Sequence, residues 1–307
     1  MIQRPKWIHD ATADEAAVDV GRRVLIKRLE TIIDYLPHAA KLDRDVVEDV
    51  HQLRVGCRRA EVALRVFRNI IRPRQRKKLH RQISRLRRAA SVARDLDMLQ
   101  ANLQHQYGHE QTVTASGEVA SSIAQRRLEA QKPIRRAYRR WKRSGSLPCI
   151  LKRFRNKFWR KDAARLSFGQ LGVIALNHGV ADFFDKGERL DDLSSLHEMR
   201  KSGKRLRYTI ELLSVAFATS WRTELYESFV DVQDRLGIVN DHAVAARLAG
   251  AWADKCNEPM AAEFRDISIR RSEQMEIQCS DFRHWWTKEK TAELKQRFDE
   301  AIASVGA

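Results

Sequence analysis

The sequence predicts an all-α protein made of two pseudosymmetric four-helix bundles that arose from an internal duplication. Its 307 residues include only 13 Gly and 6 Pro, too few for the frequent turns of a strand-rich fold. Apolar residues recur at steps of three and four along several long segments, which is the period of an amphipathic helix. Two of these segments repeat at a constant offset of 146 residues, which indicates two copies of one helical unit.

The first repeat is predicted to span residues 14–143 and to contain four helices. Its clearest apolar stripe consists of Val46, Val50, Leu53, Cys57, Ala60, Leu64, Phe67 and Ile71. That helix must end before Pro73, because proline lacks the N–H group and clashes with the preceding turn. The expected helices are Asp14–Leu36, stopped by Pro37; Arg44–Ile71; Arg74–Gln104; and Glu118–Arg143, which Pro133 starts or kinks. Gly108–Gly117 is expected to form a loop.

The second repeat is predicted to span residues 168–305. Its apolar stripe consists of Leu196, Met199, Gly203, Leu206, Ile210, Leu213 and Phe217, in register with the first. The expected helices are Gly169–Phe184, Ser194–Ala218, Trp221–Lys255 with Gly237 as a candidate break, and Pro259–Phe298. Residues 1–13 are expected to be an N-terminal tail, and residues 144–167 a basic connector between the repeats. The two repeats together are expected to form one antiparallel helical domain.

Polar positions obey the same offset of 146 residues as the apolar stripes. The matched pairs are Asp45 and Asp191, His51 and His197, Arg54 and Arg200, Arg58 and Lys204, Arg59 and Arg205, and Asp95 and Asp241. A slightly shorter offset of 144 relates Arg126, Arg127 and Trp141 to Arg270, Arg271 and Trp285. A constant offset without insertions is the signature of a true repeat.

Positive charge is concentrated in one part of the chain. The formal net charge is +18, and residues 51–165 contain 31 Lys and Arg against 7 Asp and Glu. The remainder is therefore net negative by 6. Such asymmetry predicts a partner of high negative charge density, which is nucleic acid, an anionic membrane surface or an inorganic polyanion. The alternative is a charged surface that only keeps the protein soluble.

Cationic residues share faces on several predicted helices. His51, Arg54, Arg58 and Arg65 fall within about 60° of one another on a helical wheel. No Asp or Glu occurs between Leu64 and Arg94, although exposed helix faces ordinarily mix both signs because like charges repel. We therefore favour an anion-binding role over an ordinary solvated face. The candidate binding residues are Arg23, Lys27, His51, Arg54, Arg58, Arg65, Lys77, His80, Arg87, Arg94, His197, Arg200, Lys201, Lys204 and Arg207.

Catalytic and metal-binding patterns are absent from the sequence. It contains no phosphate-binding GxxxxGK[ST] loop, no GxGxxG, no HExxH and no His/Cys cluster with zinc spacing. The four cysteines show no CxxC pairing and are interpreted as reduced thiols. Asp95 and Asp97 are candidate magnesium ligands, because carboxylates bind magnesium alongside phosphate. The favoured interpretation, however, is that Asp95 and Asp241 orient neighbouring arginines. We therefore expect no enzymatic activity, no cofactor and no metal. An enzyme acting on phosphate chains remains an alternative if Asp95, Asp97 or Asp241 holds a metal.

Two segments resemble the signature helices of the conserved histidine α-helical domain (CHAD) family. They are VHQLRVGCRRAEVALRVF and LHEMRKSGKRLRYTIELL, and ARDLDML at Ala93–Leu99 resembles the RD-x-D motif of that family. The resemblance covers residues 14–305. It implies two four-helix bundles with inorganic polyphosphate in a basic groove or pore between them. It also implies that the site includes His51, Arg54, Arg58, His197, Arg200 and Lys204.

The sequence departs from the family pattern in two respects. It has no E-x-E-x-K motif, so the triphosphatase activity of some relatives is not expected. The positions equivalent to His80 and Arg87 in the second repeat are Tyr226 and Gln233, which makes the second half a weaker cation array.

The expected function is therefore binding of inorganic polyphosphate, for which phosphate or sulfate can substitute. The alternative is a nucleic-acid-binding helical protein, although the basic helices lack interleaved aromatic residues for base stacking. No apolar run reaches the ~18 residues of a membrane span, and residues 1–10 have no apolar targeting segment. A cytoplasmic location is expected, with association with polyphosphate or storage granules.

Overall fold

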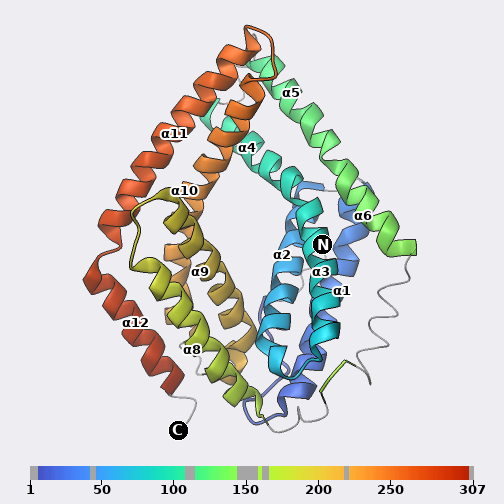
Figure 1. The fold of residues 1–307 in the computed structure, drawn as a ribbon, viewed down its shortest axis with the longest axis vertical. Helices are drawn as coiled ribbons and strands as arrows, with labels where there is room; N and C mark the ends of the chain where they lie inside the picture. The colour runs from blue at the N-terminus through green and yellow to red at the C-terminus, as the bar shows by residue number, and fades with distance from the viewer. Residues whose placement is uncertain are drawn as a thin grey trace.

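The computed structural model describes residues 6–41, 46–107, 115–143, 158–160, 166–217 and 221–303. These residues are nearly all helical and contain no β-strand, only two isolated β-bridges. The predicted all-α class is thus confirmed for the described part of the chain (Figure 1). None of the described helices is both long and apolar enough to cross a membrane. Of the expected loop Gly108–Gly117, residues 108–114 lie outside the described residues, and the rest is helical because α5 begins at Ala115. Asp45, Cys149 and most of the connector also lie outside the described residues.

The first half of the chain has more helices than predicted. They are α1 (Ala17–Lys41), α2 (Val46–Val66) with the 3₁₀ turn η1 (Phe67–Asn69), α3 (Pro73–Ala89), α4 (Ser91–Tyr107), α5 (Ala115–Glu129) and α6 (Gln131–Arg143). The stop at Pro37 was wrong, because α1 continues through it to Lys41 and the proline affects only the last turn. The single helix expected at 74–104 is divided at Ala90, whose φ of −92° and ψ of 0° are not helical. No glycine or proline signals that division.

The second half follows the prediction more closely. Its helices are α8 (Phe168–Gly187), α9 (Leu193–Leu213) with η3 (Ser214–Ala216), the π-helical turn η4 (Trp221–Leu225), α10 (Tyr226–Ala253), α11 (Met260–Trp285) and α12 (Lys288–Ala303). Gly237 does not break α10, which is continuous. The last predicted helix is divided after Trp285. Capping boxes at Ser167 and Asp192 begin α8 and α9, because each side chain accepts a hydrogen bond from the N3 backbone N–H.

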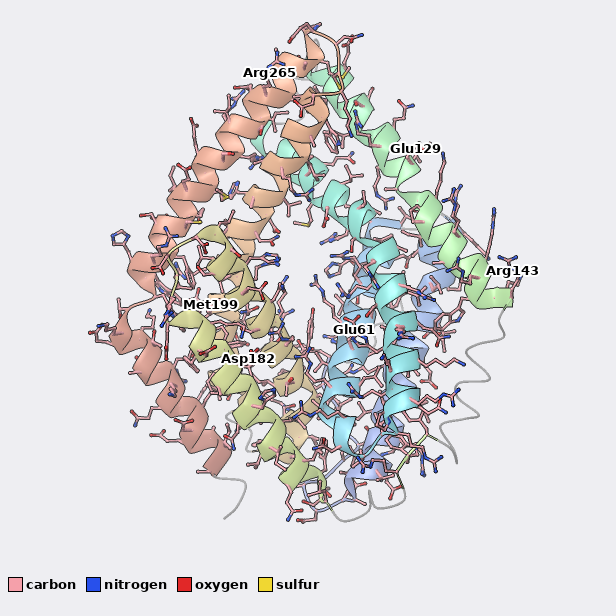
Figure 2. All side chains as sticks on the ribbon, in the orientation of Figure 1. Glu61, Glu129, Arg143, Asp182, Met199 and Arg265 are labelled. Atoms are coloured by element: carbon pink, nitrogen blue, oxygen red, sulfur yellow. The ribbon has the colours of Figure 1, made fainter. Side chains whose placement is uncertain are left out.

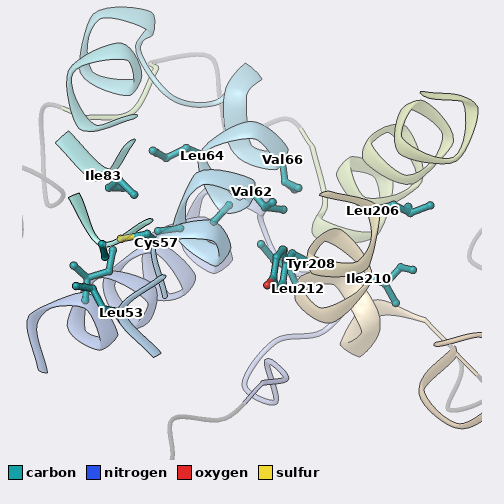
Figure 3. Packing of buried hydrophobic residues seen from close by; sticks show 14 of the residues in the cluster. Leu53, Cys57, Val62, Leu64, Val66, Ile83, Leu206, Tyr208, Ile210 and Leu212 are labelled. Atoms are coloured by element: carbon teal, nitrogen blue, oxygen red, sulfur yellow. The ribbon is translucent and has the colours of Figure 1, made fainter. Parts of the chain in front are cut away.

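The predicted apolar stripes are the packing faces of α2 and α9. Leu53, Cys57, Leu206 and Ile210 are each at most 1% exposed, and α2 packs on α1 while α9 packs on α8. A second set of apolar residues on the same helices lies where α2 meets α9 (Figure 3). It includes Val62, Val66, Tyr208 and Leu212, which are buried.

The two halves contact each other in two separate regions. Near one end of the molecule α2 packs on α9, and near the other α4 and α5 pack on α10 and α11 (Figure 1). The N-terminal segment also joins them. Trp7 makes an edge-to-face contact with Tyr226 of α10 at a centroid distance of 4.9 Å, and Ile8 is buried. Within the segment expected to be an N-terminal tail, Trp7 and Ile8 therefore contact the second half.

Candidate functional site

A cavity of about 660 Å³ opens beside the contact between α2 and α9, with α3 and α8 on its flanks. Its wall is dominated by cationic side chains and histidines. The lining residues are Arg58, Glu61, Val62, Leu64, Arg65, Arg68, Arg76, His80, Arg87, His178, His197, Arg200, Lys201, Lys204, Arg205 and Tyr208. Nine of these are Lys or Arg, and one is acidic. A wall of this composition attracts anions rather than neutral ligands.

Helical periodicity places these side chains on the cavity wall. On α9, His197, Arg200, Lys201, Lys204 and Tyr208 recur at steps of one, three and four, which keeps them on one face. Residues 58, 61, 62 and 65 of α2 and residues 76, 80 and 87 of α3 follow the same rule. The buried apolar stripes of the same helices fix the rotation about each helix axis, and thereby point the polar residues into the cavity.

Six of the cavity cations have no carboxylate partner. No ion pair within 4 Å joins any of these six to a residue in the described ranges. They are Arg58, Arg65, Arg68, Arg76, Arg200 and Lys204. The Nε atom of Arg200 is buried and has no hydrogen-bond partner there, and the same holds for Nη1 of Arg54. Buried polar atoms normally find partners. Their absence points to a ligand that supplies acceptor oxygens.

The unbalanced charge perturbs the titration of the site. Burial, together with the nearby Arg200 and Arg58, lowers the pKa of Lys204 to about 6. Burial also lowers the pKa of Arg200 to about 10. The pKa of His197 is lowered by burial and by Lys201 and Arg200. Without an anion the protein therefore carries Lys204 largely neutral at pH 7, and an anion in the cavity would restore its proton.

The few acids at the cavity edge orient particular arginines. Glu61 accepts hydrogen bonds from Ser84 Oγ at 2.6 Å and from Arg87 Nε at 2.9 Å. On the other half, Asp182 pairs with Arg205 Nη2 at 2.7 Å. Glu61 and Asp182 lie on α2 and α8, on opposite halves of the molecule (Figure 2). These pairs fix two guanidinium groups, and Lys201 pairs with Glu198, which leaves the other six cavity cations without a carboxylate partner among the described residues.

The acids considered as metal ligands have other surroundings. Asp97 is buried and accepts hydrogen bonds from Arg127 Nε at 2.5 Å and Nη2 at 3.5 Å. Burial raises the pKa of Asp95, while Arg54 and Arg247 act against that rise. Asp95 and Asp241 are close enough to repel each other. Within the described residues no three His, Cys, Asp or Glu side chains form a group suited to a metal.

The structure brings eight of the predicted residues to the cavity. They are Arg58, Arg65, His80, Arg87, His197, Arg200, Lys201 and Lys204. Three predicted residues line no part of its wall: His51, Arg54 and Arg94. They lie close together on the preceding turns of α2 and on α4. The pKa of His51 is lowered mainly by burial and further by the charge of Arg94. The equivalent histidines of the two repeats thus occupy different places.

The other predicted residues lie apart from the cavity. Arg23 and Lys27 bind the N-terminal segment, through Glu15 at 2.5 Å and Asp10 at 2.7 Å. Arg207 donates to the Tyr208 hydroxyl at 3.3 Å, and Lys77 is exposed on α3. Carboxylates already compensate Arg23 and Lys27, which removes the reason for assigning them to a ligand.

Besides Glu61, Val62 and Leu64, five further lining residues of the cavity were not predicted to bind a ligand. They are Arg68, Arg76, His178, Arg205 and Tyr208. Arg76 could have been found, since it lies one turn before His80 on the same face. Tyr208 lies one turn after Lys204 on the same face of α9 and could have been found by the same rule. His178 carries no sequence signal, because it reaches the cavity only through the packing of α8 on α9.

Comparisons with known proteins agree with this architecture. The sequence model of the CHAD domain matches residues 23–250. The fold is similar to the crystal structure of the CHAD domain from the plant Ricinus communis, with a TM-score of 0.74, 21% identity and coverage of 92% of this chain and 94% of that one. It is also similar to PptA from Streptomyces chartreusis, with a TM-score of 0.63, 13% identity and coverage of 89% and 100%. A comparison with curated proteins gave no match. The family match covers most of the chain, and the protein therefore belongs to the CHAD domain family.

Proposed function

We propose that this protein binds inorganic polyphosphate in the cavity between α2, α3, α8 and α9. The observation that carries the proposal is the group of six unpaired cations on the cavity wall, two of them on α9 and the others on α2, η1 and α3. A phosphate chain offers a regular row of anionic oxygens, and guanidinium groups bind such oxygens through charge-assisted, often bidentate hydrogen bonds. Phosphate or sulfate presents the same oxygens and would bind more weakly, because fewer contacts form.

Binding without catalysis is part of the proposal. The cavity wall presents donors and positive charge but a single carboxylate, Glu61, which is already occupied by Ser84 and Arg87. Transfer of a phosphoryl group requires a positioned nucleophile or water and a compensating cation at the leaving group. We infer a storage, sequestration or targeting role in the cytoplasm, at polyphosphate or storage granules.

The proposal includes an evolutionary element, namely that the fold consists of two pseudosymmetric four-helix bundles. The stripes on α2 and α9, related by 146 residues in sequence, pack on α1 and α8, and the two helices meet through a second set of buried apolar residues. Each half then supplies one principal wall of the cavity. A ligand between the halves would be held by both repeats, as the duplication suggests.

A nucleic-acid-binding role is the second candidate, favoured by the net charge of +18. The aromatic residues of the cavity region argue against it. Tyr208 is the only aromatic side chain on the described wall, and it is 4% exposed. Recognition of single strands depends on aromatic side chains that stack on bases.

A competition assay separates the two candidates. Labelled long-chain polyphosphate would be displaced by unlabelled polyphosphate, DNA, RNA, heparin or orthophosphate at one salt concentration. We expect polyphosphate to compete most effectively per phosphate. Stronger competition by DNA or RNA would overturn the proposal and favour the nucleic-acid role.

A further inference from the structure

A second cationic surface lies outside the cavity, on α3 and α6. All seven Lys and Arg residues of α6 are exposed, and neither α3 nor α6 contains an acid. They are Lys132, Arg135, Arg136, Arg139, Arg140, Lys142 and Arg143. None of them lines the cavity, so a ligand confined to the cavity does not account for this charge.

The exposed cations of α3 connect the cavity to α6. If Arg76 is placed at 0° on a wheel of 100° per residue, the cavity residues His80 and Arg87 lie within about 40°. Further cations continue around the helix from about 100° to about 200°, and all of them are exposed. They are Lys77, Arg88, Arg81, Arg74, Arg85 and Lys78. Gln75, Gln82 and Ala89 come next and are partly buried, and α6 packs beside α3.

These residues form a continuous band, which we call the α3–α6 band: the six exposed cations of α3 just named and the seven of α6. Lys132 pairs with Glu129 at 2.5 Å, and Arg135 Nε donates to the backbone oxygen of Ala40 at 3.3 Å. Arg136, Arg139, Arg140, Lys142 and Arg143 make no ion pair with any described residue. Like charges on adjacent turns repel each other, and an extended anion would remove that repulsion.

The surface of α10, which packs on α9, carries acids instead. Its exposed residues include Glu227, Asp231 and Asp234, and Arg235 pairs with Asp231 at 3.0 Å. An anionic chain leaving the cavity in that direction would meet carboxylates. An exit over α3 avoids these carboxylates and continues along unpaired cations.

We infer that a long polyphosphate chain leaves the cavity over α3 and continues along the exposed face of α6, so that the protein prefers long chains to short ones. The inference rests on the proposed function and extends it to chain length. Single-stranded nucleic acid fits the band less well, because the aromatic residues of α6, Tyr138 and Trp141, are partly buried and packed against the core. Stacking on bases needs exposed rings.

The test compares two variants of equal charge. The first replaces four band residues: Arg136→Gln, Arg139→Gln, Arg140→Gln and Arg143→Gln. The control replaces four exposed cations just after α10, on α11 and on α12: Lys255→Gln, Arg265→Gln, Lys288→Gln and Lys295→Gln. Arg143 lies at the end of α6, and Arg265 lies on α11 near the top of the view, away from α6 (Figure 2). Circular dichroism should show unchanged helicity for both, since all eight side chains are exposed.

Affinities for inorganic triphosphate and for long-chain polyphosphate decide the outcome. We expect the α6 variant to lose at least tenfold in affinity for the long chain relative to the control, and to bind triphosphate as the control does. The slope of log affinity against log salt concentration for the long chain should decrease by roughly 3, at about 0.7 per lost phosphate contact. Equal affinities of the α6 variant and the control for the long chain would overturn the inference.

Two further results separate this inference from the proposed function. Arg200→Glu removes a cavity cation and should weaken binding of both triphosphate and the long chain; if it weakens neither, the proposed function fails. Duplex and single-stranded DNA serve as a third ligand class. If the α6 variant loses DNA affinity and keeps long-chain polyphosphate affinity, the α3–α6 band is a nucleic-acid surface and the inference is wrong.

Discussion

Arg58 and Arg59 are adjacent on α2, but they face opposite sides of the contact with α9. Arg58 lines the cavity and has no acidic partner in the described chain. Arg59 pairs with Glu211 of α9 at 2.8 Å, and Glu211 also accepts a hydrogen bond from the Tyr226 hydroxyl at 3.0 Å. We call Arg59, Glu211 and Tyr226 the Glu211 cluster. On one side of the contact Arg59 is paired with a carboxylate of the other half, and on the other side Arg58 is not.

This difference separates structural charge from binding charge. Within the Glu211 cluster each polar group satisfies another, so the ionic contact joins the halves without any ligand. Glu211 is 1% exposed, and Tyr226 is 2% exposed. In the cavity, uncompensated cations are held next to one another by the apolar packing of their helices. Such an arrangement lowers stability until an anion enters, and we therefore expect anions to bind in the cavity rather than at the Glu211 cluster.

The largest expected effect is the loss of the Glu211 cluster. Glu211→Ala leaves Arg59 buried without its partner, and breaking a buried pair in this way costs about 3–5 kcal/mol. We expect a decrease of this size in the free energy of unfolding, measured by urea denaturation. Polyphosphate affinity of the folded protein should change less than tenfold.

Glu227→Ala is the matched control, since Glu227 is an exposed acid of α10 beside Tyr226. It should change the free energy of unfolding by less than about 0.5 kcal/mol. Equal effects of the two substitutions would show that the Glu211 cluster does not hold the halves together.

The second prediction concerns the incomplete side. Arg58→Glu should reduce polyphosphate affinity by tenfold or more, about 1.4 kcal/mol, because it replaces an attractive contact with a repulsive one. Folding should not suffer, since Arg58 lacks a carboxylate partner in the described chain and its loss relieves repulsion. Isothermal titration calorimetry gives the affinity and circular dichroism the helicity.

Lys255→Glu makes the same charge change at an exposed position outside the cavity. It should weaken binding far less than Arg58→Glu. Similar losses in the two variants would mean that net charge, rather than the cavity, determines affinity.

The third prediction is a pH dependence of binding that arises chiefly from Lys204. Its pKa is about 6 in the free protein, because of burial and of Arg200 and Arg58, and a bound anion raises it. At a pH between the pKa values of the free and the bound protein, binding is accompanied by uptake of one proton. Affinity therefore rises as pH falls toward about 6, by at most about tenfold per pH unit. Burial also lowers the pKa values of His51 and His197, so their contributions come at lower pH.

Lys204→Arg keeps the positive charge and removes this titration, because arginine stays protonated. We expect the variant to bind as tightly as the wild type at pH 6, more tightly at pH 8, and with a flatter slope between them. A slope identical to that of the wild type would assign the pH dependence to other groups, with His197→Gln as the next variant to measure.

The smallest expected effect is a gain in stability. The pKa of Lys204 is about 6 in the folded protein, against 10.5 for an ordinary lysine. Between pH 10.5 and pH 6 the lysine is therefore protonated in the unfolded chain and neutral in the folded protein. The free energy of unfolding consequently decreases as pH falls through this range. Lys204→Met removes this penalty. We expect a gain on the order of 1 kcal/mol, or a few degrees in Tm, without ligand.

That gain should grow from pH 9 to pH 6 and be accompanied by weaker polyphosphate binding. Lys201→Met is the control, because Lys201 is exposed and bonded to Glu198. A Lys204→Met protein that is less stable than the wild type would show that Lys204 contributes packing or hydrogen bonds that outweigh its buried charge.

Local sequence determined the helices and their packing faces. The stripes through Leu53 and Leu206 identified buried faces because hydrophobic periodicity is a property of neighbouring turns. It could not locate the division at Ala90, because alanine does not disfavour a helix. The division at Ala130 did have a local signal, since Pro133, expected to start or kink a helix, lies in the first turn of α6. Pro37 shows the converse, since a strong local signal had little effect in the last turn of α1.

The sequence by itself also determined that the protein is strongly cationic between residues 51 and 165, and that the two halves are related. Only the tertiary structure decided what each cation does. His51 and His197 hold equivalent positions, yet only His197 reaches the cavity; Arg59 and Arg205 are also equivalent, yet only Arg205 does. The reason is that the partner of a charged side chain is set by which helices meet. Glu211 is 152 residues from Arg59, and no local pattern records that distance.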